Sequence, residues 1–270
     1  MSNLEVHSLA SGSSGNAVLV KGGGRGLLID AGVSGRTLAA AMSARGMRIG
    51  MLDGIVLTHE HDDHLKGAAI ISARFGCPLI ANRATLQAAS YRLSLGESIE
   101  LESGDEMQVG DFRVRSFRVS HDAAEPVGYL IEYWGHRIAY ATDTGSVTRG
   151  LREALGGAQL CIVESNHDLD WLWRGPYTPI MKSRVASDRG HLSNREAAQL
   201  LAERLEERGP TTIWLAHLSR VNNSPAFARK YALEQIESRT RVPFELEIAL
   251  RDRPSVSWRP GAYVLQPTLF

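Results

Sequence analysis

The segment Thr58-His59-Glu60-His61-Asp62-Asp63-His64 decides the fold and the chemistry of this chain. It directly follows an apolar run at residues 54–57, which predicts a buried strand. Burial alone does not explain three histidines and two aspartates within six positions. Clustered imidazoles and carboxylates repel one another when charged, and they cost free energy when buried without partners. A bound dication replaces that repulsion with coordination, so the spacing predicts that His59, His61, Asp63 and His64 bind metal.

Three further candidate ligands follow other predicted strands. His121 follows the run at 112–120, Asp143 follows the run at 137–142, and His217 follows the run at 211–216. Ligands of open α/β sheets gather outside the carboxyl ends of the strands. We therefore expect these three side chains to meet the histidine cluster in one pocket.

Composition and charge set the class of the protein. The chain has 270 residues, of which 43% are hydrophobic and 22% charged, and its formal net charge is zero. These values are ordinary for a globular protein and exclude a disordered or collagen-like chain. No linker or charge block divides the sequence, which predicts one domain over residues 1–270. Because proteins that coat nucleic acid are usually basic, any contact with nucleic acid must come from a local patch.

Cysteine usage and hydropathy indicate the compartment. Cys77 and Cys161 each lie among apolar residues, so we expect buried free thiols in a reducing compartment. No apolar run approaches the roughly 18–20 residues of a membrane span. The first residues also lack the basic-then-apolar order of a signal peptide. A cytoplasmic protein without a membrane partner is expected.

Short β-branched runs alternate with helical stretches and form a weak internal repeat. The order of elements from Leu4 to Thr58 recurs from Phe112 to Glu164, with Asp143 in the place of Asp30. Two such halves predict an α/β fold, a four-layer αβ/βα sandwich of two mixed β-sheets. An ordinary doubly wound sheet uses similar pieces and remains the alternative. The predicted strands are 4–9, 17–20, 26–29, 54–57, 78–80, 112–119, 127–133, 137–141, 159–163 and 212–215, and the predicted helices are 35–45, 65–74, 83–93, 147–154, 195–208 and 225–238.

With these residues in order, the chain resembles the metallo-β-lactamase superfamily. The five motifs of that family match Asp30, the cluster at 59–64, His121, Asp143 and His217. Two further strings, at 8–16 and at 190–194 with 216–223, resemble the bacterial exonucleases of the WalJ/YycJ type. The PhnP-like cyclic phosphodiesterases and ribonuclease Z are similar in this region. The resemblance runs from Ser8 to about Ser224.

The resemblance implies a site with two divalent metal ions per chain. One ion would be held by His59, His61 and His121, and the other by Asp63, His64 and His217, with Asp143 bridging both. Nitrogen and oxygen donors suit Zn²⁺, Mn²⁺ or iron, and such a pair activates water and neutralises phosphate charge. As ligands of these metal ions, Asp63 and Asp143 would take part in catalysis. Asp30 would orient the histidine loop by hydrogen bonding, or it caps the end of its strand.

His191 is the most informative residue outside the ligand set. It precedes a capped helix, and in related phosphodiesterases the matching histidine faces the substrate phosphate. We expect it to bind a phosphate oxygen or to protonate the leaving alkoxide, the alternative being a local cap. Nearby basic residues predict contacts with a nucleic-acid backbone, although a charge cluster is also typical of a solvated face. The expected substrate-binding residues are Asn16, Lys182, Arg184, Arg189, Asn222 and Asn223, with Arg195 beside them.

These observations favour a metal-dependent phosphodiesterase acting on nucleic acid, in particular a 5′-to-3′ DNA exonuclease. A small cyclic-phosphate phosphodiesterase with the same site is the nearest alternative. An acyl hydrolase of the lactonase or thioesterase type is a further one, but it has less use for His191 and its basic neighbours. An inactive metal-binding scaffold does not need so full a set of ligands. The sequence leaves the oligomeric state open.

Overall fold

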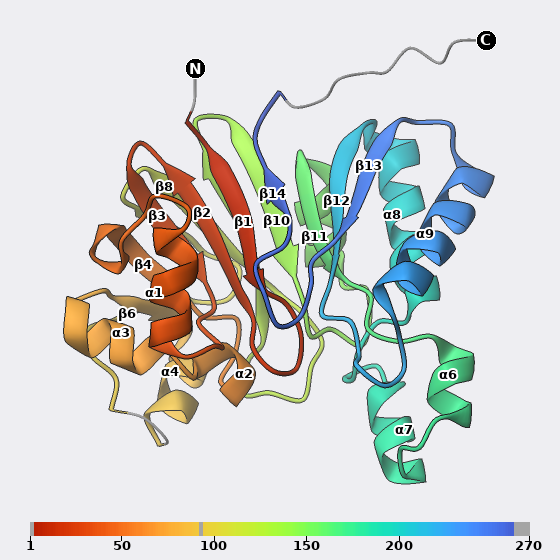
Figure 1. The fold of residues 1–270 in the computed structure, drawn as a ribbon, viewed down its shortest axis with the longest axis horizontal. Coiled ribbons are helices and arrows are strands. Elements are labelled where there is room, and N and C mark those ends of the chain that lie inside the picture. The colour runs from red at the N-terminus through yellow and green to blue at the C-terminus, as the bar shows by residue number, and fades with distance from the viewer. Residues whose placement is uncertain (1–2, 92–93, 262–270) are drawn as a thin grey trace.

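Two seven-stranded sheets pack face to face in the computed structural model, which describes residues 3–91 and 94–261. Figure 1 shows the four layers, with α1 and α3 outside one sheet and α8 and α9 outside the other. The predicted αβ/βα sandwich is therefore confirmed. The first sheet has the order β14-β1-β2-β3-β4-β5-β6, with β1 Glu5–Ala10, β2 Ala17–Gly22, β3 Arg25–Ile29, β4 Leu52–Val56, β5 Leu79–Ala81, β6 Ser98–Glu100 and β14 Ser257–Trp258.

The second sheet repeats the pattern of the first. In each sheet three antiparallel neighbours lead into parallel ones, β1-β2-β3 before β4 and β8-β9-β10 before β11. The internal repeat predicted from the sequence is thus real. The order is β13-β12-β11-β10-β9-β8-β7, with β7 Glu106–Val109, β8 Phe112–Arg118, β9 Val127–Tyr133, β10 His136–Ala141, β11 Leu160–Glu164, β12 Thr211–Ala216 and β13 Phe244–Ile248.

Helices cover the outer faces and one end of the sandwich. Asn82, Thr148 and Ser224 cap their helices by accepting a hydrogen bond from a first-turn N–H. Ser193 forms the predicted capping box with Glu196. The helices are α1 Gly35–Ser43, α2 Asp62–Leu65, α3 Ala68–Phe75, α4 Arg83–Ser90, α5 Arg149–Gly156, α6 Leu169–Arg174, α7 Pro179–Val185, α8 Asn194–Arg208 and α9 Pro225–Arg239, with a 3₁₀ turn at Ile49–Met51.

Two predicted helices differ in their boundaries from the structure. The helix expected at 65–74 is two helices, α2 and α3, which are separated at Gly67. The N–H of Gly67 donates to the carbonyl of Ala31 at 2.7 Å instead of continuing α2. A side chain at Gly67 would lie 2.4 Å from the carbonyl oxygen of Val33, so only glycine fits this close approach. The helix expected at 83–93 ends at Ser90, and residues 92–93 lie outside the described residues.

Three apolar clusters hold the layers together. The central one lies between the sheets and includes Ile29, Tyr129 and Trp214. The outer ones lie between each sheet and its helices, around Met42 on one side and Leu201 on the other. Burial of such side chains is the main favourable term in folding. Cys77 and Cys161 are buried and free, as the sequence predicted.

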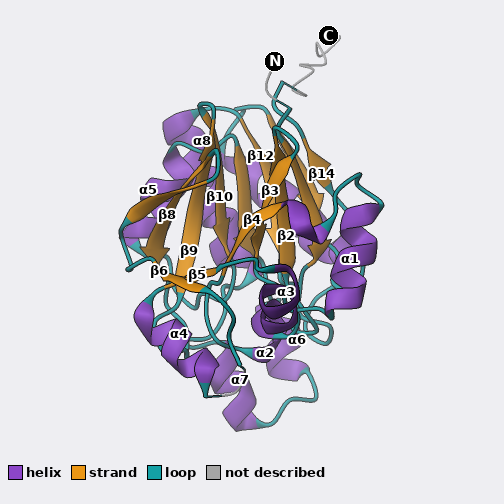
Figure 2. Cartoon of the chain, turned by 90° about the vertical axis from the view of Figure 1, so that its left-hand side faces the viewer, coloured by secondary structure: helices purple, strands orange, loops and turns teal. Residues whose placement is uncertain are grey.

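The carboxyl ends of the central strands open towards one edge of the sandwich. Figure 2 shows α2, α4, α6 and α7 gathered below this edge, away from the chain termini. Within the described residues, every helix is too short or too polar to span a bilayer. The fold thus brings segments from both sheets to one edge.

Candidate metal centre

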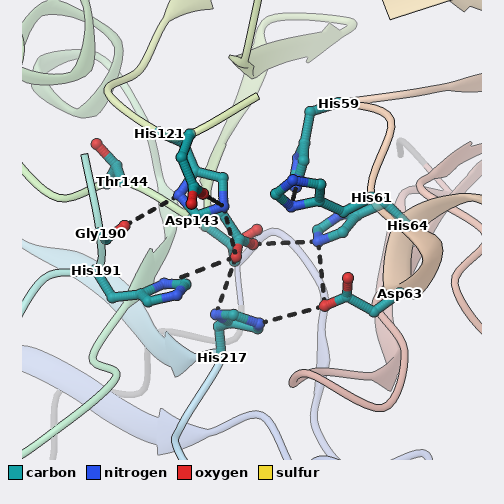
Figure 3. Close-up of polar contacts among 12 residues, drawn as sticks. His59, His61, Asp63, His64, His121, Asp143, Thr144, Gly190, His191 and His217 are labelled. Atoms are coloured by element: carbon teal, nitrogen blue, oxygen red, sulfur yellow. Dashed lines mark hydrogen bonds and ion pairs between the residues drawn. The ribbon is translucent and has the colours of Figure 1, made fainter. Parts of the chain in front are cut away.

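Strand ends from both sheets converge on one buried cluster of histidines and acids (Figure 3). Asp30 follows β3, Asp143 follows β10 and His217 follows β12. These three residues have φ of 58°, 56° and 53°, a left-handed conformation that few residues other than glycine adopt. Such backbone strain is typical of functional sites. It lies here at the three positions where a strand turns at the cluster.

Three histidines form the first group of potential ligands. The ligand atoms of His59, His61 and His121 all lie within 4.8 Å of one another. His59 Nε2 is 3.0 Å from His61 Nδ1, and His121 Nε2 is 3.7 Å from Asp143 Oδ1. His121 Nδ1 lies 3.0 Å from the carbonyl oxygen of Gly190, which fixes the ring with Nε2 towards the cluster.

The second group lies on the other side of Asp143. His64 Nε2 is 3.2 Å from Asp143 Oδ2 and 3.6 Å from Asp63 Oδ2. His217 Nε2 is 3.7 Å from the same oxygen of Asp63. Oδ1 of Asp143 faces both His121 and His217 (3.4 Å from His217 Nδ1), whereas Oδ2 faces His64, so Asp143 lies between the two groups, as Figure 3 shows. The structure brings together all seven side chains that the sequence singled out.

The cluster fits divalent cations. His217 Nε2 and Asp143 Oδ2 are buried, and neither forms a hydrogen bond with any described residue. Buried polar atoms in native proteins are nearly always satisfied, and a cation would satisfy both. The donors are imidazole nitrogens and carboxylate oxygens, which suit Zn²⁺, Mn²⁺ or iron.

The surrounding charges and burial shift the pKa values of His59 and His217 in opposite directions. Burial and neighbouring imidazoles hold the pKa of His59 well below its ordinary value, so its ring is neutral and able to bind metal. Burial also lowers the pKa of His217, but Asp143, Asp63 and Glu164 outweigh it and raise that pKa to about 10. The same three carboxylates would attract a cation beside His217.

Asp30 supports the second group from behind. Its Oδ2 lies 2.7 Å from His64 Nδ1, and its Oδ1 accepts from the backbone N–H of Thr58 at 2.9 Å. The Thr58 hydroxyl also donates to this carboxylate. With Nδ1 engaged, His64 presents Nε2 to the cluster. Asp30 itself is fully buried and contacts the start of the histidine loop.

Glu164 is a site residue that sequence reasoning missed. Its Oε1 accepts from Nδ1 of both His191 (2.8 Å) and His217 (2.7 Å). Its Oε2 accepts from the N–H groups of Thr144 and Leu192. Burial raises the pKa of Glu164, but the two histidines outweigh burial and lower it to about 2, so the carboxylate is ionised. The available signal was an acid that ends a buried strand between two predicted site strands.

His191 lies between the two groups, next to the surface. Its ring centroid is 5.1 Å from that of His121 and 5.3 Å from that of His217, and its side chain is 12% exposed. Nδ1 is held by Glu164, which leaves Nε2 as the other ring nitrogen. Burial lowers the pKa of His191, but Glu164 and Asp143 outweigh burial and raise it above its ordinary value.

The asparagines of the predicted substrate-binding set are buried. Asn16 Nδ2 lies 3.1 Å from His64 Nε2, so this side chain is at the cluster. Asn223 donates to the carbonyl oxygens of Ser165 and Asn166, which braces the loop after β12. The side-chain amide of Asn222 is also buried, and neither its oxygen nor its nitrogen forms a hydrogen bond with a described residue.

The predicted basic residues have partners within the chain. Arg184 pairs with Asp122 at 2.6 Å, and Arg189 donates to the carbonyl oxygen of His121 at 3.2 Å. Lys182 donates to the carbonyl oxygen of Trp173 at 2.7 Å. These bonds tie the segment carrying α7 to the wall of the cluster. Arg195 is exposed at the start of α8.

Known proteins similar to this chain agree with this geometry. Residues 25–217 match the family model described as the Beta-lactamase superfamily domain. The chain is 36% identical to Exodeoxyribonuclease YycJ of Bacillus anthracis over 239 residues, which cover 87% of this chain and 90% of that protein. It is 35% identical to Exodeoxyribonuclease WalJ of Streptococcus pneumoniae over 233 residues, which cover 84% and 86%.

A solved structure shares the fold. The metallo-beta-lactamase fold protein YhfI from Bacillus subtilis superposes with a TM-score of 0.71 at 17% identity, covering 95% of this chain and 99% of that one. The family match extends over more than half of the chain and includes six of the seven clustered side chains in its interior and His217 at its end. The chain therefore belongs to the metallo-β-lactamase superfamily of metal-dependent hydrolases.

Proposed function

We propose that this protein hydrolyses phosphodiester bonds of nucleic acid with two divalent cations, as a 5′-to-3′ DNA exonuclease. The relatives named exodeoxyribonuclease, which match over 84–87% of the chain, support a nuclease. The position of His191 carries the proposal, because a histidine held by an ionised acid beside two groups of ligands suits an anionic substrate. The direction of cleavage and the preference for DNA are the finer parts of the proposal.

The ligand assignment follows the two groups of side chains. His59, His61 and His121 would hold one cation, Asp63, His64 and His217 would hold the other, and Asp143 lies where it would serve both. When bound, such cations would supply Lewis acidity for the phosphate oxygens and would lower the pKa of the attacking water. Zn²⁺, Mn²⁺ and iron all suit this set of donors.

His191 acts on the substrate through Nε2. Because Nδ1 is bound to ionised Glu164, a proton on Nε2 is free to bind a non-bridging phosphate oxygen or to pass to the leaving alkoxide. Its raised pKa favours the protonated ring near neutral pH. Asp63 and Asp143 would act in catalysis as ligands of the cations, and Glu164 orients His191 and His217 together.

A second candidate function is the hydrolysis of a small cyclic phosphodiester. It is favoured by the partners that Lys182, Arg184 and Arg189 have within the chain, because engaged cations bind a polymer backbone less readily. The zero net charge points the same way.

The test compares substrates that share chemistry but differ in size. Protein loaded with Mn²⁺ or Zn²⁺ is incubated with end-labelled single-stranded DNA, duplex DNA and RNA, with bis-p-nitrophenyl phosphate and with a thioester. A 5′-to-3′ exonuclease releases the 5′ label as a mononucleotide at once and shortens a 3′-labelled strand gradually. Hydrolysis of the chromogenic diester with every polymer intact would favour the small substrate. Turnover of the thioester alone would refute both phosphodiesterase proposals.

Matched variants separate the roles of the residues. His191→Ala should keep both cations and lose most turnover, whereas His136→Ala, on β10, should behave as the wild type.

The substrate contacts predicted for Asn16, Asn222 and Asn223 and for the basic residues stay predictions, as do the cytoplasmic location and the single domain over 1–270. Limited proteolysis tests the last of these.

A further inference from the structure

An aromatic groove lies between α6 and α9, outside the metal centre. The ring centroids of Trp171 and Phe227 are 5.1 Å apart with 31° between the ring planes, and Tyr231 stacks on Phe227 at 6.0 Å and 29°. The three rings line a groove of about 580 Å³. Trp171 is 40% exposed, and Phe227 and Tyr231 are half-buried. The three rings form a tilted ladder whose Trp171 end is open to solvent.

The groove is joined to the metal centre by one loop. Val221, which lines the groove, is four residues after His217 in the segment between β12 and α9. The N–H of Asp168, at the start of α6, donates to the carbonyl of Asn222 in this same loop. Figure 1 shows α6 below the ends of the strands, beside the first turns of α9. The loop that follows His217 therefore contributes to the aromatic groove.

Cations flank the ladder on both sides of the loop. Arg174 lines the aromatic groove and forms no ion pair within the described residues. Arg220, Arg251 and Arg253 line a neighbouring groove of about 490 Å³, where Asp252 pairs with Arg220 at 3.7 Å. The carboxylate of Asp168 is engaged as the cap of α6. Asp170 is the other acid in the aromatic groove, and it is exposed.

We propose that this groove binds single-stranded nucleic acid, with a base stacked on the exposed ring of Trp171 and a phosphate beside Arg174. Aromatic rings that alternate with cations are typical of proteins that bind single strands without sequence preference. The bases must be unpaired to reach the rings, so the occupant is a single strand. The inference rests on the proposed nuclease function and names the form of its substrate.

The experiment compares substrates of two lengths in matched tryptophan variants. Trp171→Ala removes a ring from the ladder, Trp171→Phe keeps a ring there, and Trp173→Ala removes an exposed tryptophan of α6 that does not line the groove. KM is measured for a single-stranded 12-mer and for a dinucleotide. Trp171→Ala removes the stacking of one base, which only the 12-mer is long enough to use. The KM of the 12-mer divided by the KM of the dinucleotide should therefore rise about tenfold in this variant. Trp171→Phe should keep this KM ratio close to that of the wild type, because a ring remains. Trp173→Ala should leave the ratio unchanged.

Equilibrium binding separates this inference from the function on which it rests. The anisotropy of fluorescein-labelled dT12 reports binding without catalysis. If the wild type binds dT12 through Trp171 but cleaves no nucleic acid, the groove is supported and the exonuclease proposal fails. If the wild type cleaves the 12-mer and Trp171→Ala does so with the same KM ratio and affinity, the groove proposal is wrong. A dimer that becomes monomeric only in Trp171→Ala would also overturn it, since the rings would then cover a second copy.

Discussion

Replacing Glu164 with glutamine tests how the site is held together, because this buried carboxylate faces four donors and no acceptor. Two are the Nδ1 atoms of His191 and His217, and two are the backbone N–H groups of Thr144 and Leu192. Glutamine keeps one acceptor oxygen and puts an NH₂ group in the place of the other. In either orientation of the amide, two donors face a donor.

The magnitude follows from the bonds that are lost. A hydrogen bond to a charged group contributes about 1.5–3 kcal/mol, and a buried donor left without a partner costs about 1–3 kcal/mol. We therefore expect Glu164→Gln to lower the free energy of unfolding by about 2–4 kcal/mol. His217 also loses the acceptor that keeps its Nε2 towards the cluster. Changes behind a ligand of this kind typically lower metal affinity or activity by about 10–100-fold.

The assay combines three readouts on one preparation. They are kcat/KM for bis-p-nitrophenyl phosphate, the Kd of the bound cation, and unfolding by urea. Glu237→Gln, an exposed position on α9, is the matched control and should change none of them. If Glu164→Gln retains wild-type kcat/KM and cation affinity while it folds normally, the Glu164 carboxylate does not hold the two imidazoles as inferred here.

Four other predictions have defined outcomes. Asp143→Ala should lose bound metal whereas His191→Ala keeps it; mass spectrometry of the metals in both variants checks this, and the reverse pattern would refute the assigned roles. Chelation should lower Tm by about 5–15 °C, since cations at 100–1,000 times their Kd contribute about 2.7–4.1 kcal/mol; calorimetry with and without EDTA measures it, and an unchanged Tm would contradict it. Cys77 and Cys161 should react with Ellman's reagent only after unfolding, because burial raises the pKa of both thiols, that of Cys77 to about 12. The neutral Cys77 thiol should stabilise the fold fully below its ordinary value of 9 and lose that contribution as pH rises towards 12, which urea titrations at several pH values test.

The sequence predicted the parts of the fold that repeat a strong local pattern. The strand at Val127–Tyr133 matches residue for residue, since apolar residues continue through a central strand. β13, Phe244–Ile248, was missed because it is an edge strand of alternating burial, and charged residues occupy its exposed positions. α6 and α7 are short and depend on their caps at Asp168 and Thr178 rather than on periodicity.

The candidate site was predicted as far as its residues carry chemistry in the sequence itself. The loop at residues 59–64 was predicted because so many histidines and aspartates lie within six positions. Asp143 and His217 were predicted because each follows a predicted strand. Glu164 has no such pattern, because its partners His191 and His217 are 27 and 53 residues away and meet it only in the fold. Likewise, the sequence showed that Arg184 is basic but not that Asp122, 62 residues away, engages it.

The central claim is that the two groups of side chains bind one divalent cation each, with Asp143 between the two cations. Anomalous diffraction from crystals of the Mn²⁺- or Zn²⁺-loaded protein locates such ions directly. We predict two peaks about 3.5–4 Å apart, one beside His59, His61 and His121 and the other beside Asp63, His64 and His217. Peaks elsewhere, with none at these residues, would contradict the account.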